Sequence, residues 1–447
     1  MCSSDLYTAV ARLAGDLEGW VAAGGELFRD VNSPSKAFGE LVAETRHTPM
    51  VTPEALLARL TGGEQITVVD ARRFDEYNTM SIPSGVSVPG AELVRHAPAL
   101  AGSAQSPIVV NCAGRTRSII GAQSLINAGV PNPVAALRNG TIGWTLAGQA
   151  LEHGQTRRHP DVAPELDAEQ RQRVRELAER AGVRWLSLKE LPALCEAADR
   201  TTYLYDVRSP EEFQRGTLPG FASAPGGQLV QETDFFVAVR GARVVLADDD
   251  GVRASMTASW LRQMNWEVWV VSGVSTADFQ SSPVPPKRPP HPEFDRVSPA
   301  QLATWLSEGN TTVLDFTTSA NYVKRHIPGA AFVLRADLPK IASSLAQAQR
   351  IVLTCGSALL AGYAAADVRA LTDVPVHVLD GGTQAWIQAG LPLEAGETQL
   401  LSPRTDRYRR PYEGTDNPTA AMQAYLDWEY GLVAQLGKDQ SHGFFVL

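Results

Sequence analysis

The chain has 447 residues, of which 44% are hydrophobic and 20% charged, and at about 150 residues per domain this length predicts about three domains. The net charge is −9 with acidic and basic residues interspersed, which argues against a general nucleic-acid surface. No run of eighteen apolar residues is present, so we expect no nucleic acid and no membrane as partners and a cytoplasmic location.

Residues 1–47 are expected to be the remnant of a truncated unit. The stretch 14–24 has the same shape as 380–390, which ends a later repeat, but no matching front part precedes it. Residues 1–6 are interpreted as a sequence-assembly artefact, with a disordered terminus as the ordinary alternative. The apolar side chains expected to be poorly covered are Leu17, Trp20, Val21 and Leu27.

Four short apolar runs follow, and they alternate with helical patterns. The runs are 68–70, 86–88, 108–111 and 134–137. This alternation predicts an α/β fold with a parallel sheet flanked by helices. Because such sheets gather functional groups at the carboxyl ends of their strands, we expect Asp70, Arg72 and Cys112 at one edge.

The segment from Cys112 to Ser118 lies where a buried strand ends and a helix begins. A cysteine there faces unpaired N–H groups and the positive end of a helix dipole, which lowers the pKa of a thiol. Arg115 and Arg117 add positive charge. The pattern predicts a nucleophile in an anion cradle, acting on a substrate with a negative group.

The same unit recurs further along the chain. An Asp precedes a Pro by thirteen positions three times, at 70 and 83, 206 and 219, and 315 and 328. Such regular spacing indicates three tandem domains of one fold.

These motifs resemble the rhodanese family of sulfurtransferases. The resemblance covers the 112–118 loop, the preceding 68–77 and 82–83 motifs and the following 137–148 motif. Four residues separate Cys112 from Arg117, whereas the related phosphatases have five, so a phosphatase or arsenate reductase is the less favoured alternative.

The resemblance implies catalysis by a Cys112 persulfide, without a cofactor. A small anionic donor such as thiosulfate would load sulfur onto Cys112, and a thiol, cyanide or a sulfur-acceptor protein would remove it. Arg117 either holds the donor together with Arg115 or braces the loop from below. Asp70 and Arg72 are supporting residues, and the structural alternative for Arg72 is an ion pair with Glu76, repeated by Arg208 with Glu212. The implied substrate-binding residues are Ala113, Gly114, Arg115, Thr116, Arg117 and Ser118.

The other two loops depart from this pattern. Asp248 occupies the Cys112 position in the second domain, and we expect a solvated turn with a structural role. The third domain has Cys355, with Ala358 and Leu360 at the two Arg positions. Cys355 is therefore a second candidate thiol or an inert loop cysteine, and the degenerate loops leave a non-catalytic sulfur-relay or scaffold protein as an alternative function.

The remaining cysteines and the eight histidines offer no other chemistry. Cys195 lies on an apolar helical pattern and is expected in a core, and no metal-ligand spacing occurs, so no metal is expected. A solvated connecting helix, a stiff proline-rich linker and a tail whose aromatic residues cover a neighbouring unit complete the organisation. The expected segments are the remnant 1–47, the Cys112 domain 48–156, the connecting helix 157–182, the Asp248 domain 183–280, the linker 281–294, the Cys355 domain 295–396 and the tail 397–447.

Overall fold

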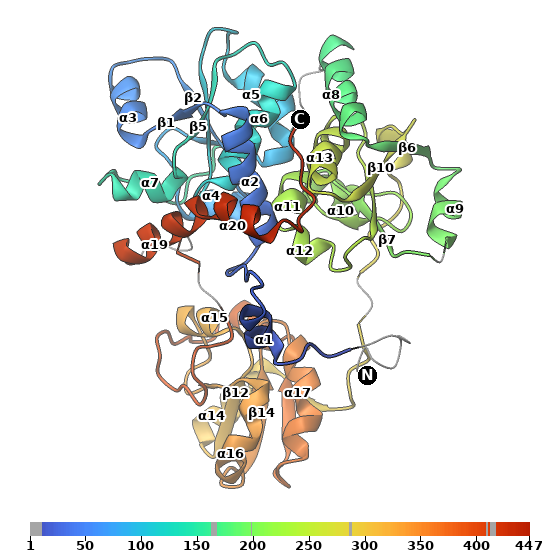
Figure 1. The fold of residues 1–447 in the computed structure, drawn as a ribbon. Helices are drawn as coiled ribbons and strands as arrows, with labels where there is room; N and C mark the ends of the chain where they lie inside the picture. Colours follow the sequence, from blue (N-terminus) through green and yellow to red (C-terminus); the bar gives the residue numbers. More distant parts are fainter. Residues whose placement is uncertain (1–10, 162–167, 198, 286–287, 408–409, 412–416) are drawn as a thin grey trace. The chain divides into compact units, whose positions relative to one another are not determined.

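The computed structural model describes residues 11–161, 168–197, 199–285, 288–407, 410–411 and 417–447 (Figure 1). It divides into two compact units, one of Met1–Pro285 with Pro411–Leu447 and one of Pro286–Arg410. Residues 1–6, interpreted above as an artefact, lie outside the described residues. No helix of the described part is long and apolar enough to cross a membrane.

The first unit contains two five-stranded parallel sheets. The first sheet has the order β1-β5-β4-β2-β3, and its central strand β4 is buried along its whole length. Its strands are β1 (Met50–Val51), β2 (Thr67–Asp70), β3 (Val86–Ser87), β4 (Ile108–Asn111) and β5 (Val134–Leu137). Its helices are α3 (Pro53–Thr61), α4 (Phe74–Thr79), η2 (Gly90–Glu92), α5 (Leu93–Leu100), α6 (Thr116–Asn127) and α7 (Gly140–Leu146).

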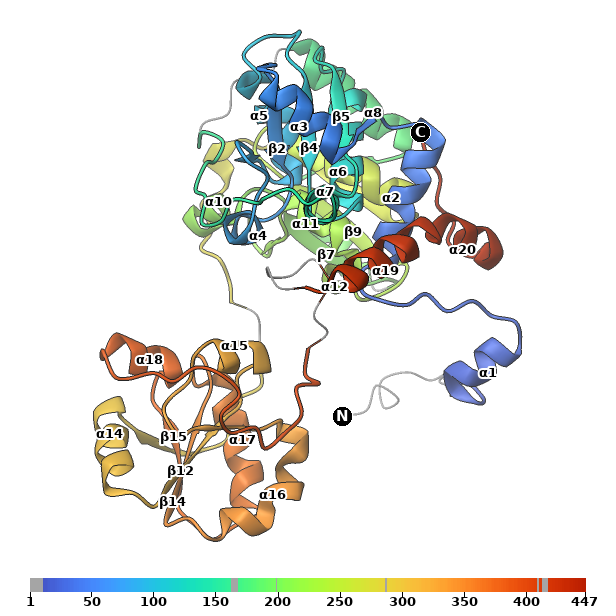
Figure 2. The ribbon, with the colours of Figure 1, turned by 90° about the vertical axis from the view of Figure 1, so that its left-hand side faces the viewer.

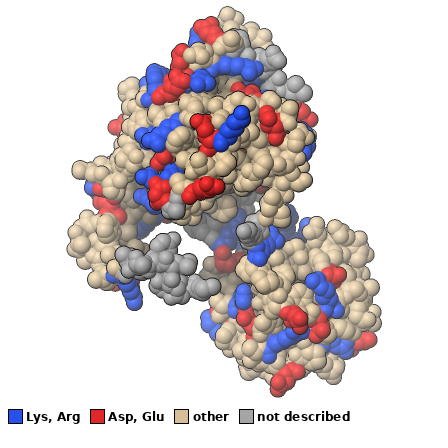
Figure 3. All heavy atoms as spheres, turned by 90° about the vertical axis from the view of Figure 1, so that its right-hand side faces the viewer, with Lys and Arg blue, Asp and Glu red and all other residues tan. Residues whose placement is uncertain are grey.

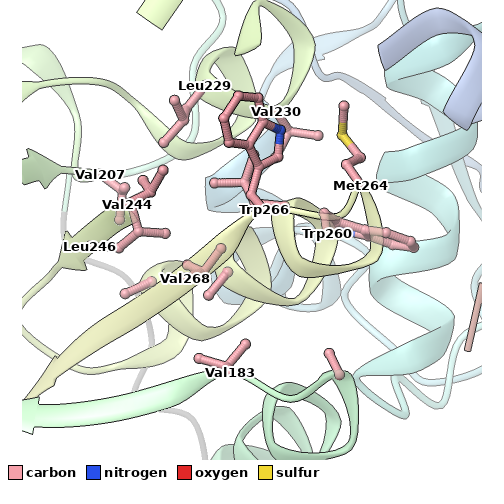
Figure 4. Packing of buried hydrophobic residues seen from close by; sticks show 14 of the residues in the cluster. Val183, Val207, Leu229, Val230, Val244, Leu246, Trp260, Met264, Trp266 and Val268 are labelled. Atoms are coloured by element: carbon pink, nitrogen blue, oxygen red, sulfur yellow. The ribbon is translucent and has the colours of Figure 1, made fainter. Parts of the chain in front are cut away.

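The second sheet repeats this topology as β6-β10-β9-β7-β8. Apolar side chains from its strands and from α13 fill one shared core, shown in Figure 4. Its strands are β6 (Arg184–Ser187), β7 (Thr202–Asp206), β8 (Ala222–Ser223), β9 (Arg243–Ala247) and β10 (Glu267–Ser272). Its helices are α9 (Leu191–Glu196), α10 (Pro210–Arg215), α11 (Gly226–Gln231), α12 (Thr233–Phe236), α13 (Val252–Gln263) and η3 (Thr276–Asp278).

The second unit contains the third sheet, with the order β11-β15-β14-β12-β13. In all three sheets the strands of a domain lie side by side in the order first, fifth, fourth, second and third. The predicted tandem α/β fold is therefore confirmed. The N–H of Phe332 in this sheet donates to the carbonyl of Gln399, and the carbonyl of Phe332 accepts from the N–H of Leu401. The domain therefore continues past the expected boundary at 396. Its strands are β11 (Asp295–Val297), β12 (Thr311–Asp315), β13 (Ala331–Phe332), β14 (Arg350–Thr354) and β15 (Val376–Leu379). Its helices are α14 (Pro299–Glu308), α15 (Ser319–Lys324), η4 (Arg335–Asp337), α16 (Leu338–Leu345), α17 (Leu359–Arg369) and α18 (Gly382–Gln388).

Two sequence-based expectations between the domains are wrong. The connecting helix is not simply solvated, because α8 (Ala168–Ala181) is amphipathic and packs an apolar stripe against α13. The stripe has helical spacing, which the high charge of the segment obscured. Cys195 is exposed rather than in a core, because α9 is only six residues long and buries Leu191 alone. The buried residues of α8 are Val174, Leu177, Ala178 and Ala181.

The segment expected to be a remnant has two different parts. In α1 (Asp16–Ala22) no residue is buried, and the Trp20 indole donates to the Glu26 carbonyl at 2.9 Å. Trp144 and Trp386 make the same bond six residues ahead, to Ala150 at 2.9 Å and Pro392 at 2.7 Å, so α1 has the geometry of a closing helix of a domain. Leu27, by contrast, is half-buried.

Helix α2 (Ser33–Arg46) is instead part of the first unit. It packs against α6 and against α20 (Leu432–Asp439), so chain segments from both ends lie side by side there (Figures 1 and 2). Helix α19 (Thr419–Tyr430) covers the first domain, as predicted for the aromatic tail. On the face in Figure 3, Lys and Arg are interspersed with Asp and Glu, in agreement with the composition.

Arg253 joins the two domains of the first unit. Its fully buried guanidinium contacts Glu92 of η2 at 2.8 Å, Glu212 of α10 at 2.7 Å and Asp249 at 2.7 Å. A buried cation with three carboxylates is stable only as a complete set, because each unpaired charge is expensive in the interior.

We expect Arg253→Met to lower the thermal unfolding midpoint of the first unit by several degrees, because removing one partner of a buried pair costs about 3–5 kcal/mol. The matched control is Arg184→Met, which removes a pair with Glu267 whose Arg is 59% exposed and should change the midpoint little. Calorimetry of both variants checks this. Equal midpoints for Arg253→Met and wild type would contradict it.

Candidate active site

The Cys112 loop joins the end of β4 to the start of α6. Cys112 is 2% exposed. The N–H groups of Thr141 and Ile142 in α7 donate to the carbonyls of Cys112 at 2.9 Å and Ala113 at 3.0 Å, which fixes the loop from one side. Gly140 makes this contact possible, because it has a φ of 53° and a Cβ there would lie 2.2 Å from the Cys112 carbonyl oxygen.

The predicted cradle depends on N–H groups that make no backbone hydrogen bond. In the described structure the backbone N–H groups of Ala113, Gly114 and Thr116 have no backbone acceptor. The N–H and hydroxyl of Ser118 lower the pKa of the Cys112 thiol, and this hydroxyl donates to the Arg115 carbonyl at 2.8 Å. The loop therefore has N–H donors available for an anion.

Arg115, expected to hold the donor, is paired with other side chains of the described structure. Its guanidinium donates to both carboxylate oxygens of Glu40 at 2.7 Å, and also to Asn139 at 3.0 Å and to the Tyr430 hydroxyl at 2.9 Å. It also lies 4.1 Å from the centre of the Tyr430 ring. The N–H donors of the Arg115 guanidinium are thus bound by residues of α2 and α19. No motif of the loop itself predicts these two segments as partners.

Arg117 has the geometry of the bracing alternative. It donates to the two oxygens of Glu76 at 2.7 and 2.8 Å, a bidentate pair between α6 and α4. The expected pair of Arg72 with Glu76 is therefore wrong, because Arg72 bonds Asp70 at 2.9 and 2.8 Å. Asn111, just before Cys112, donates to the same Asp70 at 2.7 Å, so Asp70 and Arg72 support the strand end that carries the thiol.

The second domain shows the same exchange of partners. Arg208 bonds Asp206 at 3.0 and 2.7 Å, and Glu212 pairs with Arg253 instead of Arg208. The reason is geometric: an Arg two residues after an Asp at a strand end reaches both carboxylate oxygens, whereas the Glu on the next helix faces the following loop.

Asp248 is buried, which corrects the expectation of a solvated turn. Its carboxylate accepts the N–H groups of Gly251 at 2.9 Å and Ala254 at 3.1 Å, at the positions of Arg115 and Ser118 in the first loop. Burial and the neighbouring Asp250 raise the pKa of Asp248 to about 8. The side chain thus occupies the loop position that Cys112 has in the first domain.

Cys355 lies in a loop of different shape. It is 2% exposed, but Ala358 has a φ of 66°, and Leu360 is 51% exposed. Asp315, the counterpart of Asp70, has Thr317 where the other domains have Arg, and burial raises its pKa to about 6. This loop keeps the thiol and lacks the cations of the first loop.

Helix α19 brings functional groups that sequence reasoning missed. Glu429 is 1% exposed and accepts a hydrogen bond from the Tyr425 hydroxyl at 2.5 Å. Lys36 of α2 is equally buried and lies 4.8 Å from the centre of the Tyr425 ring and 4.7 Å from that of Trp428. A Glu within the apolar stripe of α19, four residues after a buried Tyr, was the available signal.

The charges of the loop balance, and the thiol is not acidified overall. Burial raises the pKa of the Cys112 thiol, Arg117 and Ser118 oppose this, and Glu429 adds to it. The expectation of a lowered thiol pKa is therefore wrong, because burial outweighs the effects of Arg117 and Ser118. The described residues contain no group of His, Cys, Asp and Glu able to hold a metal.

Comparisons with known proteins agree with the predicted family. The model of the rhodanese-like domain matches residues 52–147, 187–277 and 298–389. A thiosulfate sulfurtransferase from Pseudomonas aeruginosa is 61% identical, with a TM-score of 0.93, over 99% of this chain and 85% of that chain.

Two other solved structures match only in part. A rhodanese-like domain of an Anabaena protein is 25% identical over 27% of this chain and 90% of its own, with a TM-score of 0.22. A 3-mercaptopyruvate sulfotransferase from Escherichia coli is 18% identical over 51% of this chain and 98% of its own, with a TM-score of 0.26.

We expect Glu76→Gln to remove part of the acid sensitivity of the first unit. Burial raises the pKa of Glu76, but Arg117, Arg72 and Arg73 outweigh it and hold that pKa at about 2. A carboxylate with a lowered pKa stabilises the fold above its ordinary value of 4.5, and this contribution, of about 3 kcal/mol, is lost as pH falls towards 2.

The measurement is urea unfolding of wild type and Glu76→Gln at several pH values. The variant should be less stable at neutral pH and should show a smaller loss of stability between pH 4.5 and 2. Glu64→Gln, which removes an exposed partner of Arg59, is the control. Parallel pH profiles for wild type and Glu76→Gln would refute the stabilising pair.

Proposed function

The chain belongs to the rhodanese family, and we propose that it is a thiosulfate sulfurtransferase that carries sulfane sulfur as a persulfide on Cys112. The sulfurtransferase class predicted from the motifs agrees with the 61% identical relative. The single observation that carries the site assignment is the set of N–H groups without backbone acceptors in the Cys112 loop. Thiosulfate or a similar donor supplies the sulfur, and a thiol, cyanide or sulfur-acceptor protein removes it.

The second domain supports a hydrogen-bond acceptor in this cradle. At the equivalent loop the two carboxyl oxygens of Asp248 accept two N–H groups, so the backbone conformation is suited to an acceptor atom at that point. In the first domain the outer sulfur of a persulfide is such an acceptor and is negatively charged. The cradle therefore stabilises the persulfide anion between the two half-reactions.

The reaction consists of two displacements. The Cys112 sulfur bonds to the outer sulfur of thiosulfate, the S–S bond of the donor breaks and sulfite leaves with the electron pair. An acceptor thiolate then attacks the outer sulfur, and Cys112 leaves. The described cysteines are all free, and a reduced thiol favours the cytoplasm as the setting.

Cys112→Ser should abolish sulfur transfer from thiosulfate and leave the fold intact, because a hydroxyl of similar size forms no persulfide. Mass spectrometry of thiosulfate-treated protein should find one added sulfur on the Cys112 peptide in wild type and none in the variant. Cys355→Ser is the matched control and should retain the added sulfur on Cys112. Sulfur on Cys355 alone, or turnover by Cys112→Ser, would transfer the role to the third domain.

A further inference from the structure

The outer side of the Cys112 loop is buried, and this distinguishes it from the Cys355 loop. Every residue from Cys112 to Thr116 is buried. In the third domain Cys355 is as buried as Cys112, at 2% exposure, but Gly356 and Ser357 after it are exposed. A Cβ placed on Gly356 would meet no atom of the described residues within 4 Å. The turn from strand to helix therefore buries the thiol in both domains, whereas the loop is covered only in the first.

Helix α19 covers the residues that follow the thiol. A Cβ placed on Gly114 would lie 3.2 Å from the Tyr425 ring and 3.2 Å from the Glu429 carboxyl. Even one added carbon atom would be crowded there, so no further peptide segment fits between the helix and the loop. Next to Gly114, Ala113 packs in an apolar cluster with Leu426 of the same helix.

The cover consists of a firmly packed helix and a more lightly packed one. Helix α2 lies against Thr116, because a Cβ placed on Gly39 would be 2.8 Å from the methyl carbon of that threonine. It buries eight of its 14 residues, and Phe38 and Val42 belong to the core shared with the second domain. Helix α19 buries four of its 12 residues. It is therefore the part of the cover that can loosen while the domain stays folded.

Transfer of sulfur from a persulfide requires direct attack, and its rate depends on access to the outer sulfur. A small thiol or cyanide needs a gap of a few atoms, which side-chain motion at a helix surface provides. A cysteine of a folded protein brings its backbone and its neighbours with it. For such an acceptor the whole of α19 would have to leave the loop.

We propose that α19 restricts the Cys112 site to small donors and acceptors, so that the acceptor is a small thiol or cyanide and not a cysteine of another protein. This rests on the sulfurtransferase function proposed above and selects among the acceptors named there. In the transfer step R–S⁻ and Cys112–S–S⁻ give R–S–S⁻ and Cys112–S⁻. The bond between the two sulfurs of the persulfide breaks, and Cys112 leaves with the electron pair.

The test compares a small and a large acceptor on protein loaded with thiosulfate, with the loss of sulfur from the Cys112 peptide followed by mass spectrometry. The acceptors are 2-mercaptoethanol and a small folded protein with one exposed cysteine. Each rate is divided by the rate of the same acceptor with glutathione persulfide in solution. In wild type the normalised rate of the protein acceptor should be lower by about 100-fold or more, as expected if the uncovered state is populated at about 1%.

Variants of α19 separate its cover from other causes of slow transfer. Leu426→Arg should loosen the helix, because Leu426 is 1% exposed and a charge is costly in its apolar cluster. The rate of the protein acceptor should rise by about 10-fold or more as the uncovered state becomes populated, and that of 2-mercaptoethanol should change little. Ala424→Arg is the matched control, because it adds the same charge at an exposed position of α19 and should keep the wild-type ratio. If Leu426→Arg does not fold, Tyr425→Ala, which removes the ring next to Gly114, should raise the same rate.

Two results would overturn the restriction by α19. One is a similar normalised rate for both acceptors in wild type. The other is a ratio of the two rates that stays at its wild-type value in the variant that loosens the helix. Failure of the proposed function is a separate outcome, because wild-type protein would then gain no sulfur on Cys112 from thiosulfate.

Discussion

Backbone N–H groups that end a buried strand and begin a helix need a negative or polar atom in front of them, and the three domains meet this need differently. In the first, the Cys112 sulfur lies at this turn. In the second, the oxygens of the Asp248 carboxyl group accept two of the N–H groups, at 2.9 and 3.1 Å. In the proposed function, the residue at this one turn therefore decides what a domain can do. Cys112 can carry a transferable sulfur atom, whereas Asp248 only forms hydrogen bonds within its own loop.

Carboxylates neutralise several buried guanidinium groups in the first unit. Arg115, Arg117 and Arg253 are each held by carboxylates from another element, so they fix loops in place rather than attract a donor over a long range. The carboxylates thereby offset the positive charge around the loop. Burial then raises the pKa of the Cys112 thiol, whereas Arg117 and Ser118 lower it.

Periodicity and motif spacing predicted the sheets, the three domains and the position of Cys112, because those features depend on residues close together in sequence. The partners of Arg115 were beyond reach, since Glu40 and Tyr430 lie on helices that meet only in the fold. The raised pKa of the Cys112 thiol was missed because its burial depends on the fold and not on the loop sequence. The burial of Asp248 was not predicted, because a carboxyl group in a turn was expected to be hydrated. In the structure, backbone N–H groups of the loop replace water as its hydrogen-bond donors.

Assembly of the site from both sides of the domain has a consequence for synthesis on the ribosome. Tyr430 follows Cys112 by 318 residues, so at 5–20 residues per second the first domain emerges roughly 15–60 s before α19 exists. During that interval its loop has a thiol but neither the cover of α19 nor the carboxyl of Glu429. Cys112 is therefore less covered in the nascent chain than in the complete one, where it is 2% exposed.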